Sequence, residues 1–403
     1  MLTFDLSRLQ RKLTRRLNHL TNDTLEMLPL PFHEGRPRVL YFIVAYPTFS
    51  ETYMHEEIRN LSNHYNIRII TYKRSDRPRR RAWQYTLIDY RMPCLVYSPV
   101  EKVNLNFDDP EQVDFLRRVD AVIEEFRPDV LHGHYLGIGV LLKKLAEKHR
   151  IPFTLRTHSM DVLSEPDNKL DAYCQVANSP WCARVLAFPA SRVRLIDHRL
   201  NPDKVAACWP VINFPQFYKP ERRPPTRRVM SGGPAIRKKA HNDFVDLAFM
   251  MRGRSDLQFD LYAGGPTLKA THEYNRGRGN PVLITYVDPE EMPAVYTEYD
   301  WLVYPSDSNI NKVGLPVSIA EAMASGIGVC WQELPGRREE QLDFLGGAGF
   351  LFRSMDELPD ILSQPYPEEK RLLGFEAARR CDIEGHKHLL TDVWDRLIPG
   401  AEL

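Results

Sequence analysis

A chain of 403 residues is longer than one hydrophobic core usually serves, so we expect two domains of about 180 residues each. Its 54 Lys and Arg residues nearly balance its 53 Asp and Glu residues, which argues against a nucleic-acid partner. Six scattered cysteines, with no Cys-x-x-Cys pair and no paired Cys/His spacing, disfavour a zinc site and a disulfide framework and fit a reducing cytoplasm.

Residues 1–20 carry leucines at spacings of three and four, with basic residues between them. This pattern predicts a basic amphipathic helix within an N-terminal extension, residues 1–36. The helix either packs on its own domain with a solvated basic face or lies on an anionic membrane surface. The longest apolar stretch, residues 39–46, is far below the roughly 20 residues of a membrane-spanning helix, and we expect no signal peptide. We therefore expect a cytoplasmic protein, either free or peripheral at the inner face of the membrane.

Over residues 37–214, short apolar runs alternate with helical stretches. Runs rich in Val, Ile and Leu that alternate with helices predict a parallel sheet covered on both faces. Residues 215–226 are rich in Pro and Arg and favour neither strand nor helix, so we place the linker there. The alternation resumes over residues 227–382 and predicts a second doubly wound sheet. The expected strands include residues 38–45, 67–73, 129–135 and 152–158, and then 227–233, 259–265, 282–287, 301–306 and 328–334.

The last segment, residues 383–403, has a continuous apolar seam at helical spacing that needs a surface to cover. Two α/β halves that each present the carboxyl ends of parallel strands suggest a ligand held between them. Many enzymes and binding proteins share this plan, so the chemistry has to be argued from motifs.

The stretch VGLPVSIAEAMASGIGV, residues 313–329, sets one acid among small and apolar residues. Start and stop signals predict a helix that begins at Pro316, ends near Ser325 and is closed by Gly326. Free backbone N–H groups at the start of this helix offer a place for phosphate. Glu321 either accepts hydrogen bonds from two vicinal hydroxyls, as on a ribose, or is a half-buried acid paired with a neighbour.

This stretch resembles the signature of the retaining GT-B glycosyltransferases of family 4, in which a helix of the type EGxPxSxxEAMAxG places its second Glu on the donor ribose. The resemblance implies that Glu321 binds the ribose of a nucleotide-diphosphate sugar. At the position of the family's first Glu, which normally contacts the donor sugar, this chain has Val313. The further donor-binding residues that the resemblance implies are Gly314, Leu315, Pro316 and Val317.

The segment SGGPAIRKKAH resembles the GRxxxxKGH segment of the same family. Gly233 and Lys239 align with it, whereas Pro234 stands in place of the family's Arg. The lysine can meet the diphosphate and stabilise it as it leaves, and Arg237 or Lys238 can supply a second charge. The alternative is a solvated lysine at a helix start. Because lysine and helix amides supply positive charge, we expect neither a metal nor a cofactor.

Two expected strand ends in the first half carry histidines, in DVLHGHY and LRTHSMD. We interpret His132 and His134 as structural hydrogen-bonding residues. LRTHSMD resembles the family's THxxD segment, which lines the cleft beside the donor sugar. The resemblance implies that His158 is a catalytic residue that positions the donor sugar and that Asp161 lies on the acceptor side.

The loop AYPTFSETYMHEEI, residues 45–58, has Thr48 and Glu51 at the spacing of a capping box, which needs no further function. It also resembles the PxxSETFIxxEI segment of a sub-branch of the family that builds exopolysaccharide and surface glycans. That resemblance implies that Ser50 and Glu51 face the acceptor. The basic run at residues 73–81 is either a solvated loop or an anchor for anionic lipid or a phosphorylated acceptor.

The motifs predict an α/β protein of the GT-B class, with two doubly wound Rossmann-like domains that face each other across a cleft. By resemblance, the last helix crosses back to the first domain. The implied activity is that of a retaining, hexosyltransferase-like enzyme that moves a sugar from a nucleotide-diphosphate sugar to a hydroxyl acceptor. The acceptor would be a glycan or a lipid-linked molecule of polysaccharide or glycoconjugate biosynthesis. The alternative is a degenerate GT-B module that binds nucleotide or glycan without transfer, for which Val313 and Pro234 are the evidence. A GT-B enzyme with an unusual donor would explain the same two departures by a changed sugar or phosphate contact.

Overall fold

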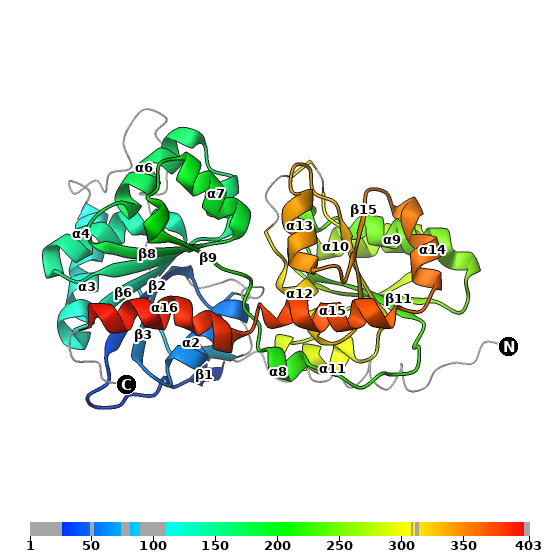
Figure 1. The fold of residues 1–403 in the computed structure, drawn as a ribbon, viewed down its shortest axis with the longest axis horizontal. Helices are drawn as coiled ribbons and strands as arrows, with labels where there is room; N and C mark the ends of the chain where they lie inside the picture. The colour runs from blue at the N-terminus through cyan, green and yellow to red at the C-terminus, as the bar shows by residue number, and fades with distance from the viewer. Residues whose placement is uncertain are drawn as a thin grey trace.

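The computed structural model describes residues 26–48, 52–73, 81–88, 110–307, 309–310 and 314–398. Several sequence predictions lie outside these residues, namely the basic helix at 1–20, Ser50, Glu51, Val313 and residues 74–80 of the basic run. Within the described part, the chain forms two helix-covered sheets that lie side by side (Figure 1). No helix in this part combines the length and the apolar character needed to cross a membrane.

The first domain contains a seven-stranded sheet in which every neighbouring pair of strands is parallel. In spatial order, its strands are β5 (Thr86–Leu87), β3 (Asn66–Lys73), β2 (Arg38–Ala45), β6 (Val130–His134), β7 (Phe153–Arg156), β8 (Cys182–Ala187) and β9 (Val205–Ala207). Its helices are α2 (Thr52–Leu61), α3 (Pro110–Phe126), α4 (Gly139–His149), α5 (Ser159–Leu163), α6 (Asp167–Ala177) and α7 (Pro189–Asp197). A separate short ribbon pairs β1 (Glu26–Leu28) with β4 (Arg81–Trp83).

This sheet is buried on both faces. Successive side chains of a strand point to opposite sides of the sheet, so each strand contributes to two cores. On β2, Leu40 and Phe42 join one core with apolar residues of α3, α4 and α6. Val39 and Tyr41 of the same strand join a second core with apolar residues of α2. The continuous apolar run of β2 therefore has the burial expected of a central parallel strand.

The second domain contains a six-stranded sheet that is also parallel throughout. In spatial order, its strands are β12 (Val282–Thr285), β11 (Gln258–Gly264), β10 (Arg228–Pro234), β13 (Trp301–Tyr304), β14 (Gly328–Gln332) and β15 (Phe350–Phe352). Its helices are α9 (His241–Met250), α10 (Leu268–Gly277), α11 (Met292–Tyr296), α12 (Val317–Ala324), α13 (Arg338–Leu345), α14 (Leu358–Ser363) and α15 (Glu368–Arg379).

In both sheets the strand order reverses near the middle. In the first sheet β2 lies between β3 and β6, and in the second β10 lies between β11 and β13. Open α/β sheets bind ligands outside the carboxyl ends of their strands at such switch points. The two doubly wound sheets agree with the sequence prediction. Their switch points indicate that a ligand would bind at those strand ends.

The chain passes between the domains twice. The first passage includes the one-turn helix α8 (Phe214–Phe217), in a segment for which we expected neither helix nor strand. Pro215 occupies its first turn, where proline does not cost a hydrogen bond. The second passage leads from α15 into α16 (Ile383–Leu397), which returns along the first domain (Figure 1). There Leu390 and Trp394 are fully buried in the same core as Tyr41 and Tyr65.

Candidate active site in the cleft between the two sheets

An open cleft lies between the domains and holds about 1540 Å³ of empty space, part of it continuous with solvent. The first domain lines it with the ends of β6 and β7 and the starts of α2 and α5. The second domain lines it with the ends of β10 and β13 and the start of α12. These are the carboxyl ends of parallel strands, where α/β folds bind ligands. The predicted site residues that line this cleft are His158, Gly233, Lys239, Gly314, Leu315, Pro316, Val317 and Glu321.

Lys239 reaches the cleft from the turn that follows β10. Gly233 at the end of β10 has a φ of 128°, which side-chain-bearing residues rarely adopt, and a Cβ there would lie 3.5 Å from Cε of Lys239. The Lys239 ammonium lies 4.2 Å from the ring centroid of Tyr304. Burial of the ammonium, aided by the charge of Lys238, lowers the pKa of Lys239 to about 7. No carboxylate of the described residues offsets this lowering, so an anion in the cleft would stabilise the charged form of Lys239.

Glu321 lies on α12, one turn beyond the residues that begin this helix. Its Oε2 accepts a hydrogen bond of 3.0 Å from the hydroxyl of Tyr296, which is buried beneath it. The helix starts after Pro316, and its first residues line the cleft together with Glu321. The arrangement places backbone N–H groups and a fixed carboxylate in one cleft, as binding of a phosphate and a vicinal diol requires.

Two predicted site residues lie away from the cleft. Arg237 is exposed, with its guanidinium 3.4 Å from Asp307, because the short turn that carries Lys239 inward leaves its first residue outside. Lys238, the other candidate for a second charge, does line the cleft. Asp161 is buried, and its carboxylate accepts hydrogen bonds from the backbone N–H groups of His158 and Leu136. Burial raises the pKa of Asp161 to about 7, and its position indicates that it holds the loop bearing His158 rather than facing an acceptor.

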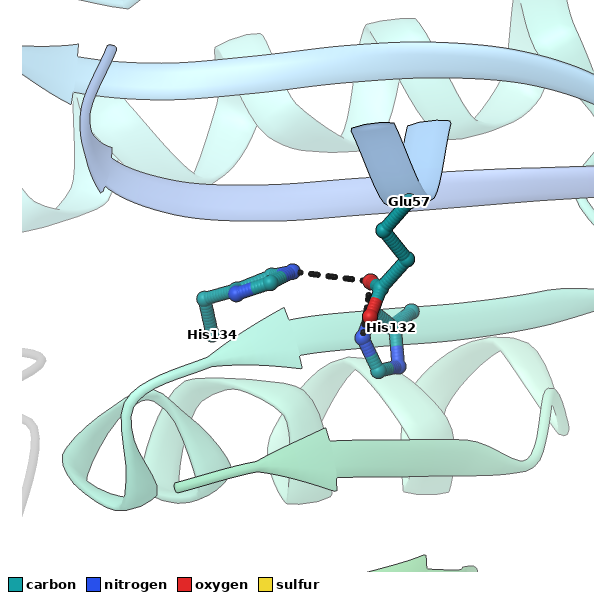
Figure 2. Close-up of side chains that lie close together, drawn as sticks. All are labelled: Glu57, His132 and His134. Atoms are coloured by element: carbon teal, nitrogen blue, oxygen red, sulfur yellow. Dashed lines mark hydrogen bonds and ion pairs between the residues drawn. The ribbon is translucent and has the colours of Figure 1, made fainter. Parts of the chain in front are cut away.

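A buried polar cluster beside the cleft was not predicted from the sequence. Glu57 of α2 is fully buried and forms a 2.7 Å ion pair with Arg156 at the end of β7. Oε1 of Glu57 faces Nε2 of His134 at 3.2 Å and Nε2 of His132 at 3.6 Å (Figure 2). Burial alone raises the pKa of Glu57, but the charge of Arg156 and the histidine hydrogen bonds outweigh it and hold the pKa well below its usual range. His132 and His134 are thus buried, hydrogen-bonded residues, as we interpreted them.

The ligand atoms of Glu57, His132 and His134 lie within 4.8 Å of one another, which is close enough for a metal ion. The donor set nevertheless fits a metal poorly. Arg156 already places a positive charge on the same carboxylate and would repel a cation. The chemistry of the cluster is that of a hydrogen-bonded ion pair in the interior of the first domain.

Comparison with known proteins gives a family match over part of the chain and a fold match over most of it. The model of Glycosyltransferase Family 4 matches residues 50–207, which lie in the first domain. A search of curated protein sequences gives no significant match. The family match therefore covers less than half of the chain.

Solved structures resemble nearly the whole chain. HepE of Anabaena in complex with UDP superposes with a TM-score of 0.66 at 13% identity, covering 89% of this chain and 100% of that one. Sucrose-phosphate synthase of Thermosynechococcus elongatus gives 0.62 at 15% identity, covering 90% and 99%. WaaG, described as a glycosyltransferase of lipopolysaccharide biosynthesis, gives 0.58 at 12% identity, covering 90% and 100%. The fold is that of the GT-B glycosyltransferases, which confirms the predicted fold class.

Proposed function

We propose that the protein is a retaining, hexosyltransferase-like glycosyltransferase of polysaccharide or glycoconjugate biosynthesis. It moves a sugar from a nucleotide-diphosphate donor to a hydroxyl of a glycan or lipid-linked acceptor. The observation that carries the proposal is the cleft in which Lys239, Glu321 and the start of α12 meet. The structural similarity to HepE, which was crystallised with UDP and with UDP-glucose, supports a nucleotide sugar as the donor.

In the proposed reaction, each element of the second domain holds one part of the donor. Glu321 accepts hydrogen bonds from the ribose hydroxyls, and Tyr296 keeps its carboxylate in place. The amides at the start of α12 and the ammonium of Lys239 receive the diphosphate. As the bond from the anomeric carbon to phosphate oxygen breaks, negative charge grows on the diphosphate, and these groups stabilise it.

The first domain supplies the wall against which the sugar is held, at the start of α2 and the ends of β6 and β7. The acceptor hydroxyl forms its new bond to the anomeric carbon on the face that the diphosphate leaves, so the configuration is retained. Its proton passes to the departing phosphate oxygen. Holding donor and acceptor in one cleft adds to the rate by orienting the reacting groups.

A panel of nucleotide sugars tests this proposal through calorimetric binding and through slow hydrolysis of the donor. We expect Lys239→Ala and Glu321→Ala each to lower hydrolysis by about 100-fold or more, since each removes a group that holds the donor or its developing charge. Lys269→Ala, at a lysine that is 91% exposed, is the matched control and should hydrolyse like the wild type. Hydrolysis that survives in both cleft variants would refute the proposal.

A degenerate module that binds nucleotide without transferring sugar is the second candidate. It is favoured by Pro234, which lines the cleft at the position where the family pattern has Arg. Tight binding of a nucleoside diphosphate, together with no turnover of any donor on any acceptor, would support this module and contradict the transferase.

Peripheral membrane contact through residues 1–20 belongs to the same proposal, because a lipid-linked acceptor would lie at a membrane surface. Anionic vesicles should sediment the full chain and should not sediment a variant that lacks residues 1–22. Equal sedimentation of the two proteins would contradict the proposed membrane contact but not the proposed sugar transfer.

A further inference from the structure

A row of hydrogen-bonded side chains leads from the interior of the first domain to the wall of the cleft. Nε2 of His134 lies 3.2 Å from Oε1 of Glu57, and Nδ1 of His134 lies 3.3 Å from Nε2 of His158. Nδ1 of His158 lies 2.8 Å from the hydroxyl of Tyr53, and both residues line the cleft. We infer that the Tyr53 hydroxyl is a donor-sugar-binding group and that Glu57 is the positioning residue that fixes its hydrogen-bonding direction. This inference rests on the proposed function, which supplies the sugar.

The direction of the row is set at its buried end, where Glu57 is a carboxylate. Nη1 of Arg156 donates to Oε2 of Glu57 at 2.7 Å and also contacts Nε2 of His386. The hydroxyl of Tyr41 donates to Oε1 at 3.4 Å, and Nε2 of His132 lies 3.6 Å from the same oxygen. A carboxylate has no proton to give, so Arg156 and Tyr41 donate to Glu57, and His134 has to do the same.

The need to donate to Glu57 fixes the donor and acceptor atoms of His134, then those of His158, and finally those of Tyr53. His134 donates from Nε2 to Glu57, and burial lowers its pKa to about 4, so the neutral ring has an acceptor at Nδ1. His158 must then donate from Nε2 to His134. Burial, with the nearby His134 and Arg156, holds the pKa of His158 well below its usual range, so its Nδ1 is an acceptor as well. Tyr53 therefore donates its only hydroxyl proton to His158.

Two consequences follow at the wall of the cleft. Both ring nitrogens of His158 have partners within the protein, and one of these partners is the Tyr53 hydroxyl, on a residue that lines the cleft beside His158. Because the Tyr53 proton points inward, its oxygen accepts from the cleft side and suits a sugar hydroxyl that donates. The SETF-like segment that residues 50–53 resemble has Phe in place of Tyr53, so this hydroxyl departs from that pattern.

The row does not carry a proton away from the substrate. Such a transfer would end with a neutral acid at Glu57, and Arg156 opposes protonation of that carboxylate. The row therefore acts by orientation, and its members keep the same protonation states throughout the proposed reaction.

Nitrogen-15 NMR of full-length protein with labelled histidines measures which ring nitrogen of His158 carries the proton. This measurement does not depend on enzymatic activity. The chain has 13 histidines, so the His158 signals are assigned by their loss in His158→Gln. We expect a neutral His158 ring with its proton on Nε2 at every pH from 5.5 to 8.5. A His158 proton on Nδ1, or a doubly protonated ring in this range, would overturn the inference.

Tyr53→Phe tests the contact with the sugar. We expect UDP to bind the variant as it binds the wild type, whereas the nucleotide sugar that the wild type uses should bind about three- to tenfold more weakly. Tyr218→Phe, at a partly buried tyrosine outside the cleft lining, is the matched control and should change neither value. Equal loss for both ligands, or no loss for either, would overturn the inference. A wild-type protein that binds no UDP would instead refute the proposed function.

Glu57→Gln tests the positioning role, because an amide can present N–H to His134 and allow the row to reverse. We expect a second His158 tautomer to appear in the NMR spectrum while UDP binding is retained. If this variant does not fold, His134→Leu breaks the row while keeping the ion pair of Glu57 with Arg156, and the same second tautomer is expected. An unchanged His158 signal would overturn the role of Glu57, as would stoichiometric zinc in purified wild-type protein that Glu57→Gln removes.

Discussion

Lys239 shows how burial of one residue turns a permanent charge into one that titrates near neutral pH. Its pKa of about 7 belongs to the cleft without ligand, and a bound diphosphate would raise it by favouring the ammonium form. Below pH 7 the lysine is charged in both states, so binding needs no proton. Above pH 7 the free protein has lost that proton and has to regain it on binding.

We therefore expect the affinity for UDP to fall as pH rises above 7, by up to about tenfold per pH unit, until the pKa of the bound state is reached. Calorimetry between pH 7.5 and 9 in buffers of different ionisation enthalpy should detect uptake of one proton. Lys239→Arg should bind with a flat profile because arginine stays charged. A flat profile for the wild type would show that Lys239 does not meet the diphosphate.

At this same scale, local motifs predicted Lys239 and Glu321 as site residues because each lies in a short contiguous motif, and the structure places both in the cleft lining. The buried cluster was missed because its partners are far apart in sequence. Glu57 and Arg156 are separated by 99 positions, and Arg156 and His386 by 230. One local signal did exist, since Glu57 shares the apolar face of α2 with Met54, Ile58 and Leu61. An acid on such a face requires a buried partner, and only the fold reveals which one.

Close packing between neighbouring elements gives a prediction for two glycines. A Cβ on Gly328, at the start of β14, would overlap the ring of Trp301 on β13. A Cβ on Gly385, in the first turns of α16, would meet nothing within 4 Å. We expect Gly328→Ala to lower the free energy of unfolding by about 1–3 kcal/mol through overpacking. Gly385→Ala should raise it by about 0.5–1 kcal/mol, because alanine favours a helix.

Urea unfolding followed by circular dichroism measures both changes. The matched control is Gly253→Ala, at a glycine with nothing within 4 Å of its Cβ position and outside the longer helices. Equal stability of the Gly328 and Gly253 variants would contradict the tight contact between β13 and β14.

Among the elements, the parallel strands were the most predictable. Their continuous apolar runs are interpretable because both faces of each sheet are buried, as on β2 and β6. The helix α8 was missed because we treated Pro215 as a helix breaker, whereas proline in a first turn can begin a helix. The β1–β4 ribbon was also missed, because two three-residue strands leave too short a pattern to detect.

Across the whole molecule, the two domains touch directly at the cleft. A Cβ on Gly314, beside the start of α12, would overlap the side chain of Ser159 at the start of α5. Farther along, the backbone N–H of Ala190 on α7 donates to Oε1 of Glu340 on α13 at 2.9 Å. The two domains are thus in direct contact beside the cleft, at a point where a single added methyl group has no room.

We expect Gly314→Ala to keep the domains apart, which should increase the radius of gyration in small-angle scattering and slow donor hydrolysis. The double variant Gly314→Ala/Ser159→Gly removes the opposing side chain and should regain both properties, a coupling that the two single variants would not predict by addition. Normal scattering and hydrolysis in Gly314→Ala would show that this contact does not set the spacing of the two domains.

Because α16 packs on the first domain, that domain is formed by two separate segments of the chain. The whole second domain lies between these segments in the sequence. A recombinant fragment that stops after β9 would lack Trp394, whose indole N–H donates a hydrogen bond to Thr154. Without Trp394, an apolar surface along Tyr41 and Tyr65 would be exposed to solvent. We expect such a fragment to precipitate when produced alone and to become soluble when a peptide of residues 383–398 is produced with it. We therefore expect that the segment matched by the family model, residues 50–207, does not fold when it is produced by itself.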